Sequence, residues 1–383
     1  MLSPKTRRTI HRIIPFALIW VVSGWVFLVV ELAATGSFKQ LPATAIKMDF
    51  QLFIMSSLAM MVVGLLTGLV ELKFLDHIFA RHNFLLRFFY KLLIYSLFFI
   101  VVELITYPLA ASLELNTHFL DQEVWDKYLR YAASITHLST GLQLATSLVL
   151  SLFYTEISEF IGQSALINFF TGKYHRAVEE ERIFMFLDMK SSTTIAEKLG
   201  HLEYFELLRA YYECFSDAIV DHEGEIYQYV GDEIILSWKF ENNEADNRCL
   251  ACFFSMRENL RKKAPWFKKK FDVVPSFKAG IHFGKVTAGE IGTIKKEILF
   301  SGDVLNATAR IQSLCNNYQV DLIVSGELKQ QLKLNSSHKV GFLGAVELKG
   351  KTEKKELYTI FKTRHRPNDP KLFFQLEDAC LES

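Results

Sequence analysis

The sequence lacks a charge excess of either sign, because 43 Lys and Arg residues nearly balance 42 Asp and Glu residues. A nucleic-acid-binding surface or a disordered tail usually depends on such an excess, so the composition favours neither. Cysteine is also scarce, with five residues in a chain of 383. Cys249 and Cys252 form a CxxC motif without a second pair nearby, which favours packed thiols over a zinc site.

Hydrophobic residues, by contrast, make up 50% of the chain and include 33 Phe, and they gather in its first part. A membrane-spanning helix needs about 20 consecutive apolar residues. Four runs approach or exceed that length, and we expect transmembrane helices at about 13–33, 50–71, 91–113 and 132–154. The first run is too long for a signal peptide, and no small-residue cleavage site ends it cleanly.

The Lys and Arg residues near these runs indicate how the chain is oriented in the membrane. Eight of them belong to the N-terminus and the second loop, whereas the first and third loops together have four. The positive-inside rule therefore places the N-terminus, the second loop and everything after Tyr154 in the cytoplasm, with the spans in the inner or plasma membrane. All five cysteines follow Tyr154, in a compartment where thiols stay reduced.

Composition and periodicity divide the chain into four parts. Residues 1–154 are expected to form a transmembrane helical domain, and residues 155–181 have the apolar spacing of a connecting signalling helix. Residues 182–363 alternate short strands with helices, and residues 364–383 form a charged tail. The charged tail is expected to pack little against the rest of the chain.

The third part has the element order β-α-β-β-α-β, which predicts a ferredoxin-like α+β domain after a bundle of four spans. Its expected elements are a strand at 183–187, a helix at 193–221, a hairpin of strands 225–229 and 234–238, a helix at 244–264, and a second hairpin of strands 276–282 and 286–291. A strand at 297–300 and a helix at 304–314 follow. His282, inside the second hairpin, is expected to be structural.

Two aspartates stand where predicted strands end. Asp188 follows the apolar strand 183–187, and Asp232 lies in the first hairpin turn beside Gly231. Because the first strand of such a unit pairs beside the hairpin, we expect the two carboxylates to meet. Without a cation they would repel each other, and Mg²⁺ or Mn²⁺ prefers carboxylates together with substrate phosphates. The alternatives are a helix cap at Asp188 and an ordinary turn residue at Asp232.

A second group of polar residues follows near the end of the domain. Asn306 and Arg310 are four residues apart and share one helix face, where they would offer hydrogen-bond donors to a negatively charged reacting centre. The alternative is a solvated helix surface. Lys349 and Lys351 flank Gly350 in a compact cationic turn that suits a terminal phosphate.

Four stretches of this domain resemble the catalytic domain of the class III nucleotide cyclases. FLDMKSST (186–193) is similar to the first metal motif of that family and YVGDEIIL (229–236) to the second, with the two aspartates 44 residues apart. GIHFGKVTAGEIG (280–292) and SGDVLNATARIQSL (301–314) are similar to its next two blocks. The resemblance covers about residues 179–362, and the whole chain is similar to the multi-pass membrane cyclases of bacteria.

The resemblance implies that a ribose 3′-hydroxyl attacks the α-phosphate of ATP, giving cyclic AMP and pyrophosphate for intracellular signalling. It also implies two Mg²⁺ or Mn²⁺ ions per active site, bound by Asp188 and Asp232 with help from the carbonyl of Met189. In that family, active sites form between two catalytic domains. We therefore expect a head-to-tail homodimer with two shared sites.

Three further roles are implied by the same resemblance. Asn306 would orient the ribose, Arg310 would stabilise the transition state, and Lys351 would contact the terminal phosphate. The base-reading positions depart from the adenylate cyclase pattern, because Gln228 and Leu299 replace the usual Lys and the usual Asp or Thr. A Gln amide both donates and accepts, so it suits adenine or guanine. We expect ATP, as in most bacterial relatives of this kind, with GTP as the alternative.

Three other functions are alternatives to this one. A diguanylate cyclase has a GGDEF motif that VGDEI partly matches, but Val230 replaces the first glycine and the NATAR stretch has no role there. A nucleotide-binding signalling module without turnover would not need the metal and transition-state residues, all of which are present. A receptor or transport activity in the membrane part is compatible with catalysis, and the sequence does not name the signal.

Two features stand apart from the catalytic motifs. Glu103 lies near the middle of the third span, where ionisable residues are costly. It is expected to contact Gln143 or His137, either as part of a signal sensor or as a protonated hydrogen-bond donor between helices. The basic and aromatic segment 261–271 (RKKAPWFKKKF) is expected to be a solvated helix end and loop, with an anionic lipid surface as the alternative.

Overall fold

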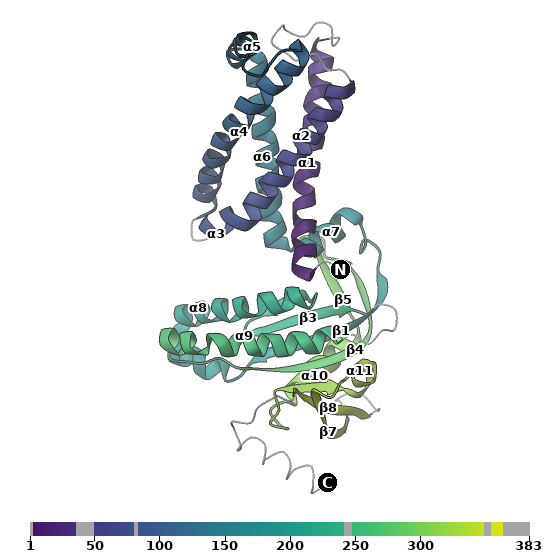
Figure 1. The fold of residues 1–383 in the computed structure, drawn as a ribbon. Coiled ribbons are helices and arrows are strands. Elements are labelled where there is room, and N and C mark those ends of the chain that lie inside the picture. The colour runs from purple at the N-terminus through teal and green to yellow at the C-terminus, as the bar shows by residue number, and fades with distance from the viewer. Residues whose placement is uncertain (1–2, 36–49, 80–82, 241–246, 348–353, 363–383) are drawn as a thin grey trace. The chain divides into compact units, whose positions relative to one another are not determined.

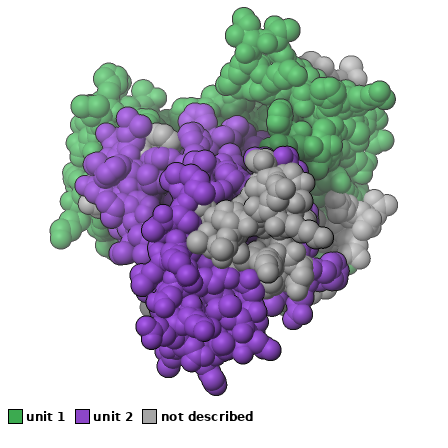
Figure 2. Space-filling model, turned by 90° about the horizontal axis from the view of Figure 1, so that it is seen from above, with its two compact units in different colours: residues 1–5, 167–383 green, residues 6–166 purple. Residues whose placement is uncertain are grey.

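The computed structural model describes the chain except for residues 1–2, 36–49, 80–82, 241–246, 348–353 and 363–383 (Figure 1). The prediction for the tail 364–383 and the position of Lys351 therefore lie outside the described residues. The chain forms two compact units, one of residues 6–166 and one of residues 1–5 with 167–383, which Figure 2 shows in different colours.

Four helices of the described residues in the first part are long and apolar enough to cross a membrane, as predicted. The candidate spans are Pro4–Val30, Phe53–Leu75, Leu85–Leu115 and His137–Ile161. The helices of this part are α1 (Pro4–Thr35), α2 (Phe50–Val70), the π-helical turn η2 (Glu71–Leu75), α3 (Asp76–Phe79), α4 (Phe84–Leu115), α5 (Gln122–Ala132) and α6 (Ile135–Ile161). The predicted number of long apolar helices is confirmed, and the ends of the candidate spans differ from the predicted ends by two to nine residues.

Buried and partly buried polar contacts join these helices to one another. Lys91 of α4 pairs with Glu71 of η2, and the Tyr95 hydroxyl donates to Glu71 Oε2 over 2.9 Å. Glu103 of α4 contacts His137 of α6, with 2.8 Å between Oε1 and Nδ1. The predicted contact between Glu103 and a second span is therefore present, and its partner is His137.

The segment 155–181 is not one continuous connecting helix, which corrects that prediction. Helix α6 continues through residue 155 and ends at Ile161, and a short helix α7 covers Gln163–Thr171. Gly162 has φ +92° and Gly172 has φ +64°. Glycine adopts such conformations readily, and they end a helix, so the two glycines interrupt the helical spacing. Strand β1 has already begun at Val178.

The second unit is built on a mixed sheet in the order β2-β3-β1-β4-β6-β8-β7, with β5 paired to β4. The strands are β1 (Val178–Met189), β2 (Glu225–Val230), β3 (Glu233–Lys239), β4 (Phe277–Ile291), β5 (Glu297–Ser301), β6 (Leu322–Ser325), β7 (His338–Glu347) and β8 (Lys354–Lys362). The helices are α8 (Ser192–Asp221), α9 (Arg248–Phe271), α10 (Asp303–Ser313) and α11 (Gly326–Gln331). The run from β1 to β4 has the predicted ferredoxin-like order βαββαβ.

Strand β1 is buried on both faces, which explains its continuous apolar run IFMFL. Ile183, Met185 and Leu187 pack in one hydrophobic cluster with residues of α8 and α9. Phe184 and Phe186 point to the other face and pack in a second cluster that includes residues of α10. Successive side chains of a strand alternate between faces, so a strand between two helical layers has no polar face.

The predicted second hairpin, 276–282 with 286–291, is wrong, because these residues form the single strand β4 of 15 residues. Gly284 does not turn the chain but pairs opposite Arg182 of β1. A Cβ atom at Gly284 would lie 3.2 Å from the side chain of Val304, so glycine allows α10 to approach the strand closely. His282 is buried in the middle of β4, with its Nδ1 2.8 Å from Ser325 Oγ.

Gly280 of β4 lies very close to the backbone of α10. A Cβ atom there would lie 2.5 Å from the backbone nitrogen of Gln312 and 2.7 Å from its Cα. Gly280→Ala is therefore expected to push α10 away from the sheet and to lower the free energy of unfolding by about 1–3 kcal/mol, the usual cost of overpacking. Thermal unfolding of the detergent-solubilised full chain would measure this loss.

Gly341→Ala on β7 is the matched control, since its added Cβ would meet only the methyl carbon of Thr359 at 3.1 Å. A methyl group at the end of a side chain moves more easily than a helix backbone. Equal unfolding temperatures for Gly280→Ala and Gly341→Ala would contradict the close backbone approach at Gly280.

Candidate active site

The two candidate carboxylates meet in the structure, as the strand order predicts. Strands β1 and β3 are antiparallel, and Asp188 pairs opposite Glu233, the residue after Asp232. Gly231 has φ +62° and forms the turn between β2 and β3. The Tyr212 hydroxyl of α8 lies 2.9 Å from the Gly231 carbonyl oxygen and thereby ties this turn to the helix.

The position of Asp188 is unfavourable for a lone carboxylate. Burial and then the adjacent Asp232 carboxyl raise the pKa of Asp188 above its usual range, and Lys278 acts in the opposite direction. Burial, Asp188 and Asp232 also raise the pKa of Glu233. Within the described residues, Asp232 Oδ2 is buried and has no hydrogen-bond partner. The site therefore concentrates negative charge that the described side chains compensate only in part.

This donor set fits a divalent cation. A buried carboxylate oxygen without a partner is costly, and a cation bound to it would remove that cost. In the part of the chain that the structure describes, no group of three or more His, Cys, Asp or Glu residues could hold a metal ion. Two carboxylates with open positions suit Mg²⁺ or Mn²⁺, which fill those positions with substrate phosphates and water.

Asp188 is not the cap of the following helix. The N-cap of α8 is Ser191, which has φ +55°, and Asp188 lies three residues earlier, within β1. The alternative interpretation of Asp188 as a helix cap is therefore wrong. Met189, whose carbonyl was expected to assist a metal ion, is the last residue of β1 and pairs with Phe277 of β4.

Two residues at this site were missed by the sequence analysis. Lys278 of β4 pairs opposite Asp188, and its Nζ lies 3.3 Å from Asp188 Oδ2. Gln312 of α10 donates a hydrogen bond from Nε2 to the same oxygen over 3.2 Å. The pairing of β1 with β4 would have indicated Lys278, whereas the sequence offers no comparable signal for Gln312.

Asn306 and Arg310 lie on the outer side of α10. Asn306 is exposed and Arg310 is partly exposed. The buried side of the helix is formed by Val304, Ala307, Thr308, Ile311 and Gln312. The contact that the structure shows between α10 and Asp188 comes from this buried side, through Gln312.

The two predicted base-reading residues lie on neighbouring segments. Gln228 is exposed on β2, opposite Ile235, and Leu299 lies on β5, opposite Gly289, with 38% of its surface exposed. Their sequence neighbours Tyr227 and Phe300 pack together, with 5.0 Å between the ring centres. The part of β2 that carries Gln228 therefore lies beside the part of β5 that carries Leu299.

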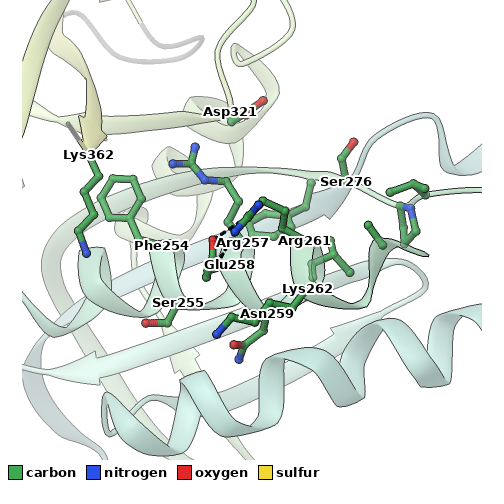
Figure 3. A pocket seen from close by; sticks show the side chains of 15 residues that line it. Phe254, Ser255, Arg257, Glu258, Asn259, Arg261, Lys262, Ser276, Asp321 and Lys362 are labelled. Carbon is green, nitrogen blue, oxygen red and sulfur yellow. Dashed lines mark hydrogen bonds and ion pairs between the residues drawn. The ribbon is translucent and has the colours of Figure 1, made fainter. Parts of the chain in front are cut away.

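A groove of about 950 Å³ runs along α9 beside the start of β4 (Figure 3). Its lining residues include Phe254, Arg257, Arg261, Lys262, Ser276 and Lys362, and Arg261 is held by Glu258. Neither candidate carboxylate lines this groove, so it is separate from the candidate active site.

The expected helix end and loop in segment 261–271 is wrong, because α9 continues through Pro265 to Phe271. Phe267 and Phe271 are buried in the core, and this packing keeps the end of the helix in place. Cys249 and Cys252 are buried in the same helix, in the hydrophobic cluster beneath the sheet.

Comparisons with known proteins agree with this geometry. Residues 176–362 match the sequence model of the family described as the adenylate and guanylate cyclase catalytic domain. Adenylate cyclase 2 of Rhizobium meliloti (strain 1021) is 33% identical over 203 residues, which are 53% of this chain and 56% of that protein. Adenylate cyclase 1 of the same organism is 24% identical over 237 residues, 60% of this chain and 34% of that protein.

The chain thus spans about half of the first relative and about a third of the second. Among solved structures, a bacterial light-regulated adenylyl cyclase matches with a TM-score of 0.50 and 19% sequence identity, over 63% of this chain and 69% of that chain. This similarity concerns the fold alone. The family match, the strand order and the ordered motifs lead to one conclusion: residues 176–362 belong to the family of adenylate and guanylate cyclase catalytic domains.

Proposed function

We propose that the chain is a membrane-bound nucleotide cyclase that converts ATP to cyclic AMP and pyrophosphate for intracellular signalling. The observation that carries this proposal is the meeting of Asp188 and Asp232 at the end of β1, with one buried oxygen of Asp232 lacking a partner in the described structure. Both adenylate cyclases of Rhizobium meliloti support ATP over GTP as the substrate.

In the proposed reaction, the ribose 3′-oxygen forms a bond to the α-phosphorus of ATP. The bond from the α-phosphorus to the bridging oxygen breaks, and pyrophosphate and the hydroxyl proton leave. Asp188 and Asp232, with the Met189 carbonyl, would hold two Mg²⁺ or Mn²⁺ ions per site. Such ions neutralise phosphate charge and activate the attacking hydroxyl.

The protein's own side chains would bind and orient the nucleotide. Lys278 Nζ lies 3.3 Å from Asp188 Oδ2. Lys278 would add positive charge beside the phosphates of a bound nucleotide. Asn306 would orient the ribose, and Arg310 would donate to the phosphate oxygens on which charge develops in the transition state. Lys351 would contact the terminal phosphate. Gln228 and Leu299 would contact the base.

The proposed active unit is a head-to-tail homodimer with two shared sites. Arg310 and Gln312 point about 200° apart on an α-helix, so they serve opposite sides of α10. Gln312 faces the carboxylates of its own chain, whereas Asn306 and Arg310 face outward. This division supports a site in which one chain supplies the carboxylates and a second copy supplies Asn306 and Arg310.

The four apolar helices support insertion into a bilayer before the catalytic domain. We propose the inner or plasma membrane, with the catalytic domain in the cytoplasm, from the distribution of Lys and Arg. In this arrangement residues 1–154 receive a signal, residues 155–181 transmit it, and residues 182–363 carry out catalysis. Glu103 and His137, in contact within the membrane part, are candidates for sensing that signal.

The substrate is tested by a product assay on the full chain in detergent. ATP and GTP would be supplied separately with Mn²⁺, and the products would be identified by mass spectrometry. We expect cyclic AMP from ATP, with at most about a tenth of that rate for cyclic GMP, which corresponds to about 1.4 kcal/mol of discrimination. Cyclic GMP as the main product would keep the mechanism and make the chain a guanylate cyclase.

The absence of cyclic product from either nucleotide would contradict the proposed activity and favour a nucleotide-binding signalling module. Asp232→Ala, prepared in the same detergent, provides the background rate for both nucleotides. Any product that the variant makes at an unchanged rate comes from a contaminating enzyme.

A further inference from the structure

Helix α10 contacts the candidate metal site through a residue that the reaction outlined above does not use. Gln312 is buried, with 6% of its surface exposed. Its Nε2 donates to Asp188 Oδ2, the same oxygen that lies 3.3 Å from Lys278 Nζ. One oxygen of Asp188 is therefore held from two directions, by α10 and by β4.

The sheet fixes the position of Gln312. The Gly280 position on β4 leaves no room for a Cβ atom, because the Gln312 backbone nitrogen would lie 2.5 Å from it. Gly280 pairs opposite Phe186, two residues before Asp188. The backbone of Gln312 is therefore held against the strands that carry Asp188 and Lys278.

The amide chemistry of Gln312 suits a supporting role. An amide nitrogen donates to a carboxylate without bringing a second negative charge. It can fix the orientation of the carboxylate while the other oxygen stays available to a cation. Partners of this kind orient metal ligands, and their loss typically weakens metal affinity by about 10–100-fold.

We propose that Gln312 is a positioning residue that orients Asp188 for its divalent cations and, through α10, links the two active sites of the dimer. The proposal rests on the proposed function, because the same helix would present Asn306 and Arg310 to the second site. A movement of α10 would then change the carboxylate geometry in one site and the transition-state contacts in the other. The two sites would respond together.

The first test measures Mn²⁺ binding to the full chain in detergent, without nucleotide, from the electron paramagnetic resonance signal of free Mn²⁺. Gln312→Met keeps the length and volume of the buried side chain and removes its donor. We expect the Kd for Mn²⁺ to rise about 10–100-fold. Gln330→Met is the matched control, since Gln330 is exposed on α11, and its Kd is expected to stay unchanged.

An unchanged Kd in Gln312→Met would overturn the positioning role. The unfolding temperature of the metal-free protein, measured in the same samples, separates a folded variant from an unfolded one. Gln312→Asn supplies a second readout, because it retains the donor on a shorter side chain and is expected to bind Mn²⁺ with intermediate affinity. This test does not require turnover, so its outcome is distinct from that of the product assay.

The link between sites is tested in a mixed dimer of Asp232→Ala with Arg310→Ala, which retains one complete site. Gln312→Met in the Arg310→Ala chain alters the carboxylates of that complete site, so we expect a higher Mn²⁺ concentration for half-maximal rate. Gln312→Met in the Asp232→Ala chain alters the helix that supplies Arg310, so we expect a lower kcat with an unchanged Mn²⁺ requirement. If Gln312→Met changes the rate only when it stands in the Arg310→Ala chain, the proposed link between the sites is wrong.

Discussion

Replacement of Asp232 by Ala is expected to lower kcat by about 10³-fold or more, equivalent to about 4 kcal/mol of transition-state stabilisation. The change removes one of the two carboxylates that would hold the divalent cations. It also removes the neighbour that helps to raise the pKa of Asp188. The rate of cyclic nucleotide formation by the full chain, measured over a range of Mn²⁺ concentrations, checks this expectation.

The fold should survive this substitution. The conformation of the turn depends on Gly231, with φ +62°, and on the Tyr212 hydroxyl that contacts the Gly231 carbonyl oxygen, and neither involves the Asp232 side chain. Removal of an oxygen that is buried and has no partner among the described residues is expected to leave the unfolding temperature unchanged or to raise it. Asp217→Ala, at an exposed carboxylate of α8, is the matched control and should keep full activity.

A variant that folds normally and retains more than about a tenth of the rate would lose less than about 1.4 kcal/mol of stabilisation. Such a loss is too small for an essential metal ligand. It would favour the interpretation of Asp232 as an ordinary turn residue, and Asp188 with Lys278 would then become the centre of the site.

The meeting of the two aspartates could be predicted from the sequence because it follows from topology. An antiparallel β1–β3 pair places the end of one strand beside the start of the other, whatever the side chains are. The apolar run before Asp188 and the glycine before Asp232 marked both ends of this pair. Local spacing and strand order were therefore sufficient for this part of the site.

The predictions of secondary structure were wrong where tertiary packing overrides the local preference of a glycine or a proline. A turn was predicted between the strands 276–282 and 286–291, whereas Gly284 within this interval serves the close approach of Val304 on α10. The helix that was predicted to end at residue 264 continues through Pro265, because the burial of Phe267 and Phe271 keeps α9 in place beyond it. Glycine and proline indicate what the backbone can do locally, and packing decides which possibility is realised.

Gln312 could not be recognised from the sequence for a related reason. Helical spacing showed that Asn306 and Arg310 share a face, but it does not show which strand the opposite face contacts. That contact depends on the absence of a side chain at Gly280 and on the pairing of β1 with β4. Both facts concern residues that are far from Gln312 in the sequence.

Co-expression of Asp232→Ala with Arg310→Ala is expected to restore activity that neither variant has alone. In a head-to-tail dimer with shared sites, a heterodimer of the two variants contains one site with neither substitution. With equal expression and random pairing, half of the dimers are mixed and each has one of two sites, so we expect at most about a quarter of the activity of the unchanged protein. Two different affinity tags would allow the mixed dimers to be purified and assayed.

The tags also supply the decisive control, because they separate a failure to pair from a failure to share sites. Purified mixed dimers would show about half of the activity per dimer of the unchanged protein if the two sites act independently. Mixed dimers without activity would mean that each chain completes its own site, so that the outward face of α10 serves another purpose. Recovery well below half would instead indicate that the damaged site impairs the intact one, which would agree with a link between the sites through α10.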